Sequence, residues 1–372
     1  MRPPALLAIA LLSLSAAPVR AADYVVRPDG SGDFPTIQAA VDAAVDDDVI
    51  QLSEGVFAGP GNRDVQVVDK TLVIRSLNGN PAQCTIDCQS AGRGFSFEGF
   101  QRHSRVEGIT ITGGREEVGG AILDRAGIYV VNCIFRGNLA DQVAGAAVST
   151  SGIFQGCRFE DNTALECCGA IGGGSGGSTC CLTLRDCVFL RNSARFGAAV
   201  DLESLSPTRA AVIQRCTFAE NVATGPGGIV SIQGGSAVIE ACTFAENSTG
   251  GRGALDLDWL TPVISNTIIA FTIGGPAVSC DSSAPTLICC DLYGNTGGDW
   301  VGCLAGQAGQ EGNLSADPLF CDPSIHDYGL NIDSPCGPEH NPGCGLIGAW
   351  PEECGTVPIV QTTWGGLKAR FR

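Results

Sequence analysis

The sequence is poor in charged residues, and positive charge is the scarcer kind. Only 16% of the 372 residues are Asp, Glu, Lys or Arg, and 22 basic residues stand against 39 acidic ones, for a net charge of -17. A coiled coil needs about half of its residues to be Ala, Glu, Lys, Leu and Arg, so the composition argues against one. It also argues against a nucleic-acid partner, because an acidic surface repels phosphate and no basic stripe interleaved with aromatics occurs.

Long hydrophobic runs are scarce too, and the longest lies at the N-terminus. Arg2 precedes an apolar stretch from Ala5 to Ala17, and Val19-Arg20-Ala21 offers small residues at the spacing of a cleavage site. We interpret residues 1–21 as a secretory signal peptide, because a spanning helix needs about 20 apolar residues. The mature chain is then predicted to be secreted, extracellular or attached to a cell surface, without a transmembrane span, where disulfides persist.

Glycine and cysteine are abundant, with 51 and 19 residues, and the cysteines mark a repeat. Five segments share the pattern Cys-x-Phe-x-x-Asn, and their cysteines lie 24, 30, 29 and 26 residues apart. Segments such as Gly197-Ala198-Ala199-Val200 alternate with them, so each period holds short β-prone runs separated by Gly or Asn turns. The repeated residues are Cys133, Cys157, Cys187, Cys216 and Cys242, with Phe135, Phe159, Phe189, Phe218 and Phe244, with Asn138, Asn162, Asn192, Asn221 and Asn247, and with Cys290 in a degraded copy.

Short periods without helical periodicity predict a coil whose turns stack in register. Positions i and i+2 of a strand share a face, so the Cys and Phe of each repeat are predicted to point inward. Stacking at about 4.8 Å places like on like, in columns of Cys, Phe and Asn. Before the repeats, Ile37, Ala40, Val41 and Ala44 fall at helical spacing and predict a cap helix.

The segment from Val106 to Asn295 resembles right-handed parallel β-helix proteins of the pectin-lyase-like superfamily. Its paired Gly-Gly-Ala-Ile and Phe-x-x-Asn elements are similar to the repeats of polymorphic outer membrane proteins, which build surface passengers. The resemblance implies an all-β fold: a right-handed, single-stranded parallel β-helix, or solenoid, of about ten rungs in one continuous domain. We expect a cap over 22–48, repeats over 49–295, final rungs and a cysteine-rich cap over 296–354, and a basic tail, 355–372, that is a sorting signal or a frayed end.

Catalytic motifs of related enzymes are missing. Residues 29–38 resemble the opening of pectin methylesterases, yet no segment matches that family's catalytic Gly-x-x-Asp-Phe-Ile-Phe-Gly pattern. His103, His326 and His340 lack the Gly-His-Gly context of polygalacturonases, and the Arg-x-Pro-x-x-Arg pattern of pectate lyases does not occur. The resemblance therefore implies an architecture and no particular chemistry, and we assign no catalytic residue.

One group of acidic residues falls into register in the Gly-Ala segments. Residues i and i+2 share a face, so Asp201, Glu203, Asp256 and Asp258 are predicted to form an outward patch, with about 9.6 Å between the two pairs. A solvated face is the simplest interpretation, while binding of a sugar or of a cation such as Ca²⁺, and glycosidase-like catalysis, stay open. Trp259 is predicted to pack inward rather than to stack on a sugar. The predicted column holds Leu123, Ser149, Gly172, Asp201, Ser231 and Asp256.

The cysteines divide into two groups. The six in the repeat column are predicted to be buried thiols, because Cβ atoms one rung apart lie about 4.8 Å from each other and a disulfide prefers about 3.8 Å. Cys167-Cys168 and Cys180-Cys181 are predicted to form disulfides. Zinc binding is the alternative, but these adjacent cysteines lack the two to four residues that usually separate zinc ligands. Local bridges from Cys84 to Cys88 and from Cys336 to Cys344 are also expected, and no metal site is assigned.

These observations favour a non-catalytic binding or adhesion module. Its expected partner is an extracellular polysaccharide or a cell surface, and Ca²⁺ is the one candidate cofactor. A polysaccharide lyase or glycoside hydrolase that uses the acidic patch is the first alternative, and a structural spacer that binds nothing is the second.

Overall fold

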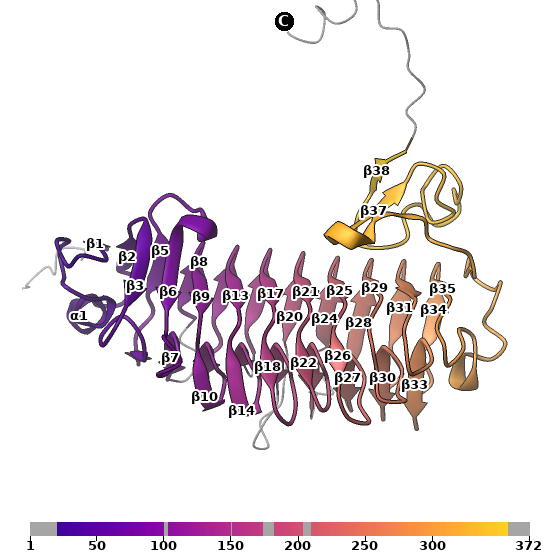
Figure 1. The fold of residues 1–372 in the computed structure, drawn as a ribbon, viewed down its shortest axis with the longest axis horizontal. Helices are drawn as coiled ribbons and strands as arrows, with labels where there is room; N and C mark the ends of the chain where they lie inside the picture. Colours follow the sequence, from indigo (N-terminus) through magenta and orange to yellow (C-terminus); the bar gives the residue numbers. More distant parts are fainter. Residues whose placement is uncertain (1–20, 100–102, 150, 174–181, 204–209, 356–372) are drawn as a thin grey trace, which may run out of the picture.

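The chain winds into one long coil with a small cap at each end, as the ribbon of the computed structural model shows (Figure 1). The structure describes residues 21–99, 103–149, 151–173, 182–203 and 210–355. The apolar part of the predicted signal peptide, the basic tail after residue 355, and Cys180 with Cys181 lie outside these ranges. Within them, no helix is long and apolar enough to cross a membrane.

Three long sheets form the walls of the coil, and their strands pair in parallel. An eleven-stranded sheet contains β1 (Asp23–Val26), β2 (Val49–Leu52), β5 (Val73–Ser76), β8 (Arg105–Glu107), β12 (Tyr129–Val131), β16 (Ile153–Gln155), β20 (Thr183–Arg185), β24 (Ala211–Gln214), β28 (Ala237–Glu240), β31 (Val263–Ser265) and β34 (Thr286–Ile288). A ten-stranded sheet contains β3 (Gly55–Ala58), β6 (Cys84–Asp87), β9 (Thr110–Thr112), β13 (Ile134–Arg136), β17 (Arg158–Glu160), β21 (Val188–Leu190), β25 (Thr217–Ala219), β29 (Thr243–Ala245), β32 (Ile268–Ala270) and β35 (Asp291–Tyr293).

The third wall is a nine-stranded sheet, and a shorter sheet fills one corner. The nine-stranded sheet contains β4 (Val65–Val68), β7 (Phe95–Glu98), β11 (Ile122–Asp124), β15 (Ala147–Ser149), β19 (Ile171–Gly173), β23 (Val200–Leu202), β27 (Val230–Gln233), β30 (Leu255–Asp258) and β33 (Val278–Asp281). The corner sheet contains β10 (Arg115–Val118), β14 (Leu139–Val143), β18 (Thr163–Ala164), β22 (Ser193–Ala194) and β26 (Val222–Ala223). The predicted all-β parallel coil is confirmed.

The N-terminal end of the coil is covered by the helix α1 (Ile37–Ala43), as the sequence predicted. Thr36 begins it, because its Oγ1 accepts a hydrogen bond of 3.2 Å from the backbone N–H of Ala39 and so satisfies one of the free donors of the first turn. The face formed by Ile37, Ala40 and Val41 is buried. The helix therefore shields the apolar interior of the first rung from water.

The repeated phenylalanines and cysteines lie inside the coil. The rings of Phe135, Phe159, Phe189, Phe218 and Phe244 stack with successive centroids 4.6–4.8 Å apart, which is the spacing of the strands. All six cysteines of the column are buried and unbonded to one another. The interior is thus a continuous apolar column, in which five successive rungs contribute Phe and the rungs on either side contribute Ile111 and Ile269.

The repeated asparagines form a hydrogen-bonded ladder at a corner of the coil. The Nδ2 of Asn162 donates to Oδ1 of Asn192 over 2.9 Å and to the backbone oxygen of Phe135 over 3.0 Å. Asn192 repeats this arrangement with Asn221 and the backbone oxygen of Phe159. Each Oδ1 also accepts from the backbone N–H of the preceding asparagine, so these fully buried amides are satisfied.

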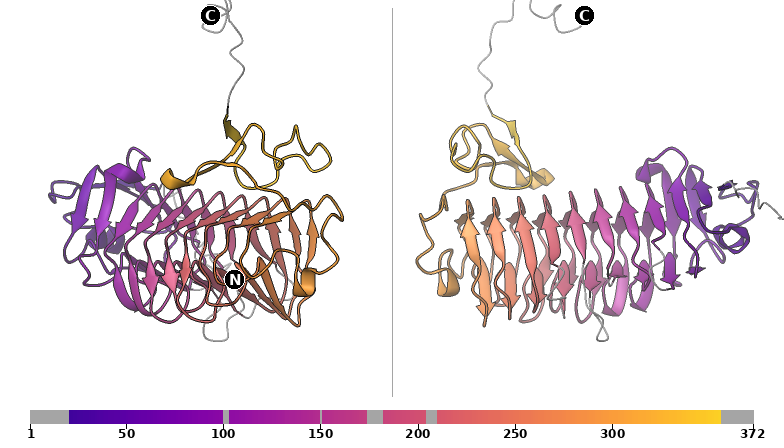
Figure 2. Two further views of the ribbon diagram at one scale, coloured as in Figure 1. Left: turned by 45° about the vertical axis from the view of Figure 1, so that its right-hand side comes forward. Right: turned by 180° about the vertical axis from the view of Figure 1, so that it is seen from behind.

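After β35 the chain closes the last rung and then folds back. Residues 296–316 cover the end of the coil, where Leu304 is buried. The C-terminal cap contains a three-stranded sheet that lies beside the coil (Figure 2). Its elements are β36 (Phe320–Asp322), β37 (Asp327–Asn331) and β38 (Glu352–Cys354), while short 3₁₀ turns lie at η1 (Pro81–Gln83), η2 (Gly302–Leu304) and η3 (Pro323–Ile325).

Three disulfides brace this end of the molecule, and they differ from the predicted local bridges. They join Cys280 to Cys303, Cys289 to Cys344, and Cys321 to Cys354. The expected bridge from Cys336 to Cys344 is wrong, because Cys344 pairs with Cys289 and the buried thiol of Cys336 instead donates to Asp291 over 3.2 Å.

The expected bridge from Cys84 to Cys88 is also wrong, since both are free thiols. Cys84 begins the extended strand β6, and four residues of strand separate the two Cα atoms by about 13 Å. A disulfide requires a Cα separation of about 7 Å or less.

Candidate functional site

The outer face of the nine-stranded sheet carries a hollow of about 240 Å³. All four acidic residues predicted from the sequence line it: Asp201 and Glu203 at β23, and Asp256 and Asp258 on β30. Arg252 also lines the hollow, so its lining contains four carboxyl groups and one guanidinium group.

The strand register explains why these carboxyl groups meet. Asp201 pairs with Ser231 on β27, and Ser231 pairs with Asp256 on β30, so the two aspartates stand two rungs apart in one column. The small side chain of Ser231 lies between them and leaves the hollow open.

The upstream part of the predicted column requires one correction. Val148, rather than Ser149, pairs with Leu123 and with Gly172. Gly119 has a left-handed backbone conformation with φ +65°, and Ala144, not Gly145, takes the same position one rung later with φ +59°. The prediction aligned Gly119 with Gly145, so its register in this rung is wrong by one residue. Ser149 instead pairs with Asp124, to which its hydroxyl donates over 2.6 Å.

Asp201 lies deeper than the predicted solvated patch. Its side chain is only 9% exposed and it has no hydrogen-bond partner among the described residues. Burial, reinforced by the nearby charges of Glu203 and Asp256, raises the pKa of Asp201 to about 7. The carboxyl group is therefore partly protonated at neutral pH.

Asp256 has the opposite surroundings, because Arg252 neutralises it. The Nε of Arg252 donates to Asp256 Oδ2 over 3.0 Å, and its terminal nitrogen donates to Asp281 on the neighbouring rung over 2.7 Å. Burial raises the pKa of Asp256, and the guanidinium group of Arg252 opposes that shift. Arg252 thus fixes the position of the carboxylate at the centre of the hollow.

Asp258 lines the hollow at the end of β30, and Trp259 is the next residue in the sequence. Asp258 Oδ2 accepts a hydrogen bond of 3.3 Å from Gln233, whereas its Oδ1 is buried and has no partner among the described residues. Trp259 is 68% exposed, so the prediction that it packs inward is wrong. The strand β30 ends at Asp258 and Trp259 has φ +60°, which breaks the alternation on which that prediction depended.

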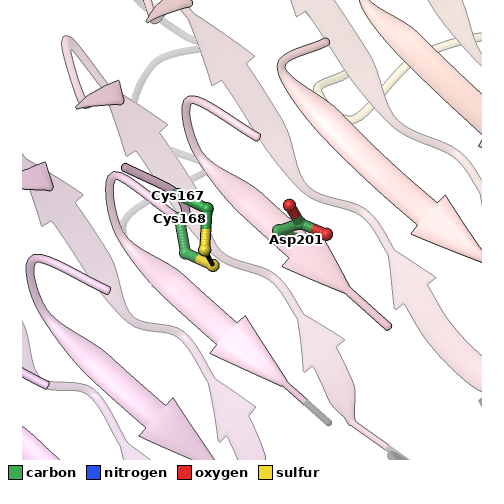
Figure 3. A group of neighbouring side chains, drawn as sticks. All are labelled: Cys167, Cys168 and Asp201. Carbon is green, nitrogen blue, oxygen red and sulfur yellow. Dashed lines mark hydrogen bonds between the residues drawn. The ribbon is translucent and has the colours of Figure 1, made fainter. Parts of the chain in front are cut away.

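Two adjacent cysteines lie at the near end. The Sγ atoms of Cys167 and Cys168 are 3.1 Å apart, and both lie within 4.8 Å of a carboxylate oxygen of Asp201. Figure 3 shows the two thiols side by side, with Asp201 on the neighbouring rung. Their predicted disulfide partners, Cys180 and Cys181, lie outside the described residues. The sequence did not predict that these cysteines lie near Asp201, because only the cysteines were matched with one another along the chain.

A second hollow, of about 190 Å³, lies between the C-terminal cap and the ten-stranded sheet. His326 Nδ1 lies 2.6 Å from an oxygen of Glu220, and the hydroxyl of Tyr328 donates to Glu220 and to Glu246 over 3.0 and 3.2 Å. The indole N–H of Trp350 donates to Thr217 over 2.7 Å. These contacts hold the cap against the coil. The partners of His326 are far from it in the sequence, so no sequence motif pointed to them.

No known protein family and no curated protein matches the sequence. Among solved structures, the pectate lyase Pel9A is similar with a TM-score of 0.48 and 14% identity, over 89% of this chain and 96% of that one. A rhamnogalacturonan lyase is similar with a TM-score of 0.43 and 12% identity, over 94% of this chain and 98% of that one. The alginate lyase AlyGC has a TM-score of 0.38 and 13% identity, over 90% of this chain and 60% of that one.

The pairing of the strands defines the fold independently of these similarities. Successive rungs add one parallel strand to each of the three walls, from the cap helix to residue 295. The chain is a right-handed parallel β-helix with about ten rungs.

Proposed function

We propose that the chain is an extracellular, non-catalytic binding module for a neutral or amino-sugar polysaccharide, and that the acidic hollow is its binding site. The observation that carries the proposal is Trp259, a large exposed aromatic residue that directly follows Asp258, the last acidic residue that lines the hollow. An aromatic face packs against the apolar face of a sugar ring, while carboxylates accept hydrogen bonds from its hydroxyl groups.

The charge of the hollow supports an uncharged or positively charged ligand. Four carboxyl groups and one guanidinium group line it, and the whole chain has a net charge of -17. Polysaccharides built from uronic acids carry one negative charge per sugar and are repelled by such a field. The three disulfides support an extracellular setting, because disulfides persist in oxidising compartments.

The test is a binding assay on a panel of neutral, amino-sugar and uronic-acid polysaccharides. We expect binding to a neutral or amino-sugar polymer, reduced about tenfold or more in Trp259→Ala, which corresponds to a loss of about 1.4 kcal/mol. Asp258→Asn is expected to weaken binding less, because the amide keeps one acceptor oxygen. The matched control is Tyr129→Ala, which removes an exposed ring from the eleven-stranded sheet and is expected to bind like the wild type.

Two outcomes would contradict this proposal. The first is binding to no member of the panel, which favours a structural spacer. The second is binding that Trp259→Ala leaves unchanged, which would show that Trp259 is not part of the binding site.

Hydrolysis of a glycosidic bond is the second candidate, and Asp201 favours it. An inverting glycosidase pairs a carboxyl group of raised pKa, as general acid, with a carboxylate about 6.5 to 9.5 Å away, as general base. Asp201 has a pKa of about 7, and Asp256 lies two rungs away, a separation of about 9.6 Å. Release of new reducing ends from the bound polymer, abolished in both Asp201→Asn and Asp256→Asn, would replace the binding-only proposal.

A further inference from the structure

The near end of the hollow contains donor atoms that a sugar does not require. The sulfur atoms of Cys167 and Cys168 lie side by side, and the carboxyl group of Asp201 on the next rung has an oxygen within 4.8 Å of both (Figure 3). We propose that Cys167, Cys168 and Asp201 bind a thiophilic divalent cation such as Zn²⁺ or Cd²⁺. This metal site is distinct from the proposed polysaccharide site, and its test does not depend on whether the chain binds a polysaccharide.

The donor distances suit a cation held by two sulfurs and an oxygen. With Zn–S bonds of about 2.3 Å, two sulfurs of a tetrahedral site lie about 3.8 Å apart. The two Sγ atoms are 3.1 Å apart, and the donor atoms of the three residues all lie within 4.8 Å of one another. Side-chain movements of less than about 1 Å bring these donors to coordination distance.

The backbone keeps the space between the donors open. A Cβ atom on Gly172 would lie 2.8 Å from Cys168 Sγ, and one on Gly197 would lie 3.1 Å from Asp201 Oδ2. Cys168 itself has φ +66°, a conformation that costs a non-glycine residue energy, and its N–H donates to the backbone oxygen of Phe196 over 3.0 Å. The adjacent rungs therefore fix the two thiols relative to Asp201.

Asp201 is the independent indication that a cation belongs here. Asp201 is only 9% exposed, has no hydrogen-bond partner among the described residues, and has an oxygen within 4.8 Å of both sulfurs. Leaving a carboxylate buried and unpaired is costly, and a bound cation removes that cost. Thiolate ligands select soft cations, so this donor set favours Zn²⁺ or Cd²⁺ over the Ca²⁺ expected from the carboxylates alone.

Binding at this site must displace protons. The thiolate rather than the thiol is the metal ligand. A cation M²⁺ that binds Cys167 and Cys168 therefore replaces their two thiol protons and takes an oxygen of Asp201 as a third ligand. Two protons leave, and two M–S bonds and one M–O bond form, without any change of oxidation state.

The experiment is a titration of the chain with Cd²⁺ after reduction by a phosphine and anaerobic desalting. The readout is the ultraviolet charge-transfer absorbance of cadmium thiolates. The background is the double variant Cys180→Ser, Cys181→Ser, which removes the thiols outside the described residues. We expect this background to bind one more equivalent of Cd²⁺ than the same chain with Cys168→Ser added. Adding Asp201→Asn to the background is expected to weaken Cd²⁺ binding at least tenfold.

Controls separate this site from other thiols and from the polysaccharide site. Cys216→Ser, in the buried column, and Trp259→Ala are expected to keep the full equivalent. Affinity is expected to rise at least tenfold per unit of pH between 6 and 8, because protons are displaced. The proposal is overturned if the reduced background gives no charge-transfer band, or if folded Cys168→Ser and Asp201→Asn variants titrate like the background.

Discussion

A single buried carboxyl group sets the chemistry at the residue scale. Asp201 has lost most of its contact with water, and Glu203 and Asp256 add negative charge nearby. Folding therefore favours its protonated form, since the folded pKa of about 7 lies above the ordinary value of 3.8. The same group that could bind a cation or donate a proton destabilises the fold when it ionises alone.

The pH dependence of stability tests this description of Asp201. The protonated carboxyl group of Asp201 makes its full contribution to the free energy of unfolding below about pH 4. This contribution is lost as the pH rises through about 7. In the presence of a chelator, Asp201→Asn should match the wild type at pH 4 and exceed it at pH 8.5, by up to about 4 kcal/mol. Thermal unfolding across this pH range measures the difference. Glu339→Gln, which changes an exposed carboxylate in the C-terminal cap, should follow the wild type, and parallel curves for Asp201→Asn would contradict the prediction.

At the scale of the element, each strand gains its stability from copies of itself in neighbouring rungs. Phe189 stacks between Phe159 and Phe218 at 4.7 Å on either side. Asn192 connects the same rungs through its amide and satisfies backbone groups that would otherwise be buried without partners. A substitution in either column therefore damages three rungs rather than one.

We expect both columns to be sensitive at their middle positions. Phe189→Ala should lower the free energy of unfolding by about 3 to 5 kcal/mol, because it leaves a cavity that rigid neighbouring rungs cannot fill. Asn192→Ala should cost about 1 to 3 kcal/mol for each buried group left unsatisfied. Urea unfolding followed by circular dichroism measures both. Val238→Ala, on an exposed position of β28, is the control, and an effect equal to those of the column variants would argue against the stacked interior.

At the scale of the whole molecule, the C-terminal cap is a separate layer attached to the coil. It contacts the ten-stranded sheet through Thr217, Glu220 and Glu246, and the disulfide from Cys289 to Cys344 joins it to the coil beside β35. This bond closes a stretch of 55 residues, which restricts the unfolded chain. The chain-entropy estimate for such a loop is about 4 kcal/mol.

Removing this disulfide should loosen the cap before it affects the coil. In Cys289→Ser, Cys344→Ser we expect proteases to cut first within residues 317–354, while the β-helix repeats stay resistant. Limited proteolysis with mass spectrometry of the fragments measures this. Cleavage that begins inside the coil would show that the bond stabilises the rungs directly.

The sequence predicted the repeating part of this molecule and missed the parts that do not repeat. The columns of Cys, Phe and Asn follow from period and strand alternation alone, so Phe159 or Asn192 could be placed without a structure. Trp259 could not, because one left-handed residue after β30 turns its ring outward. The depth of Asp201 and its nearness to Cys168 depend on how two corner turns pack, and no pattern in the sequence records that geometry.

The cover over the last rung has a consequence for how copies of the chain meet. Strands β33, β34 and β35 end their sheets, and an uncovered end strand has backbone groups that can pair with a further strand. Residues 296–316 lie across this end, with Trp300 and Leu304 packed on the interior, while α1 lies at the opposite end. Because every rung has nearly the same shape, an uncovered end would fit the first rung of another copy. The two covers therefore keep a repeating chain from growing into a filament.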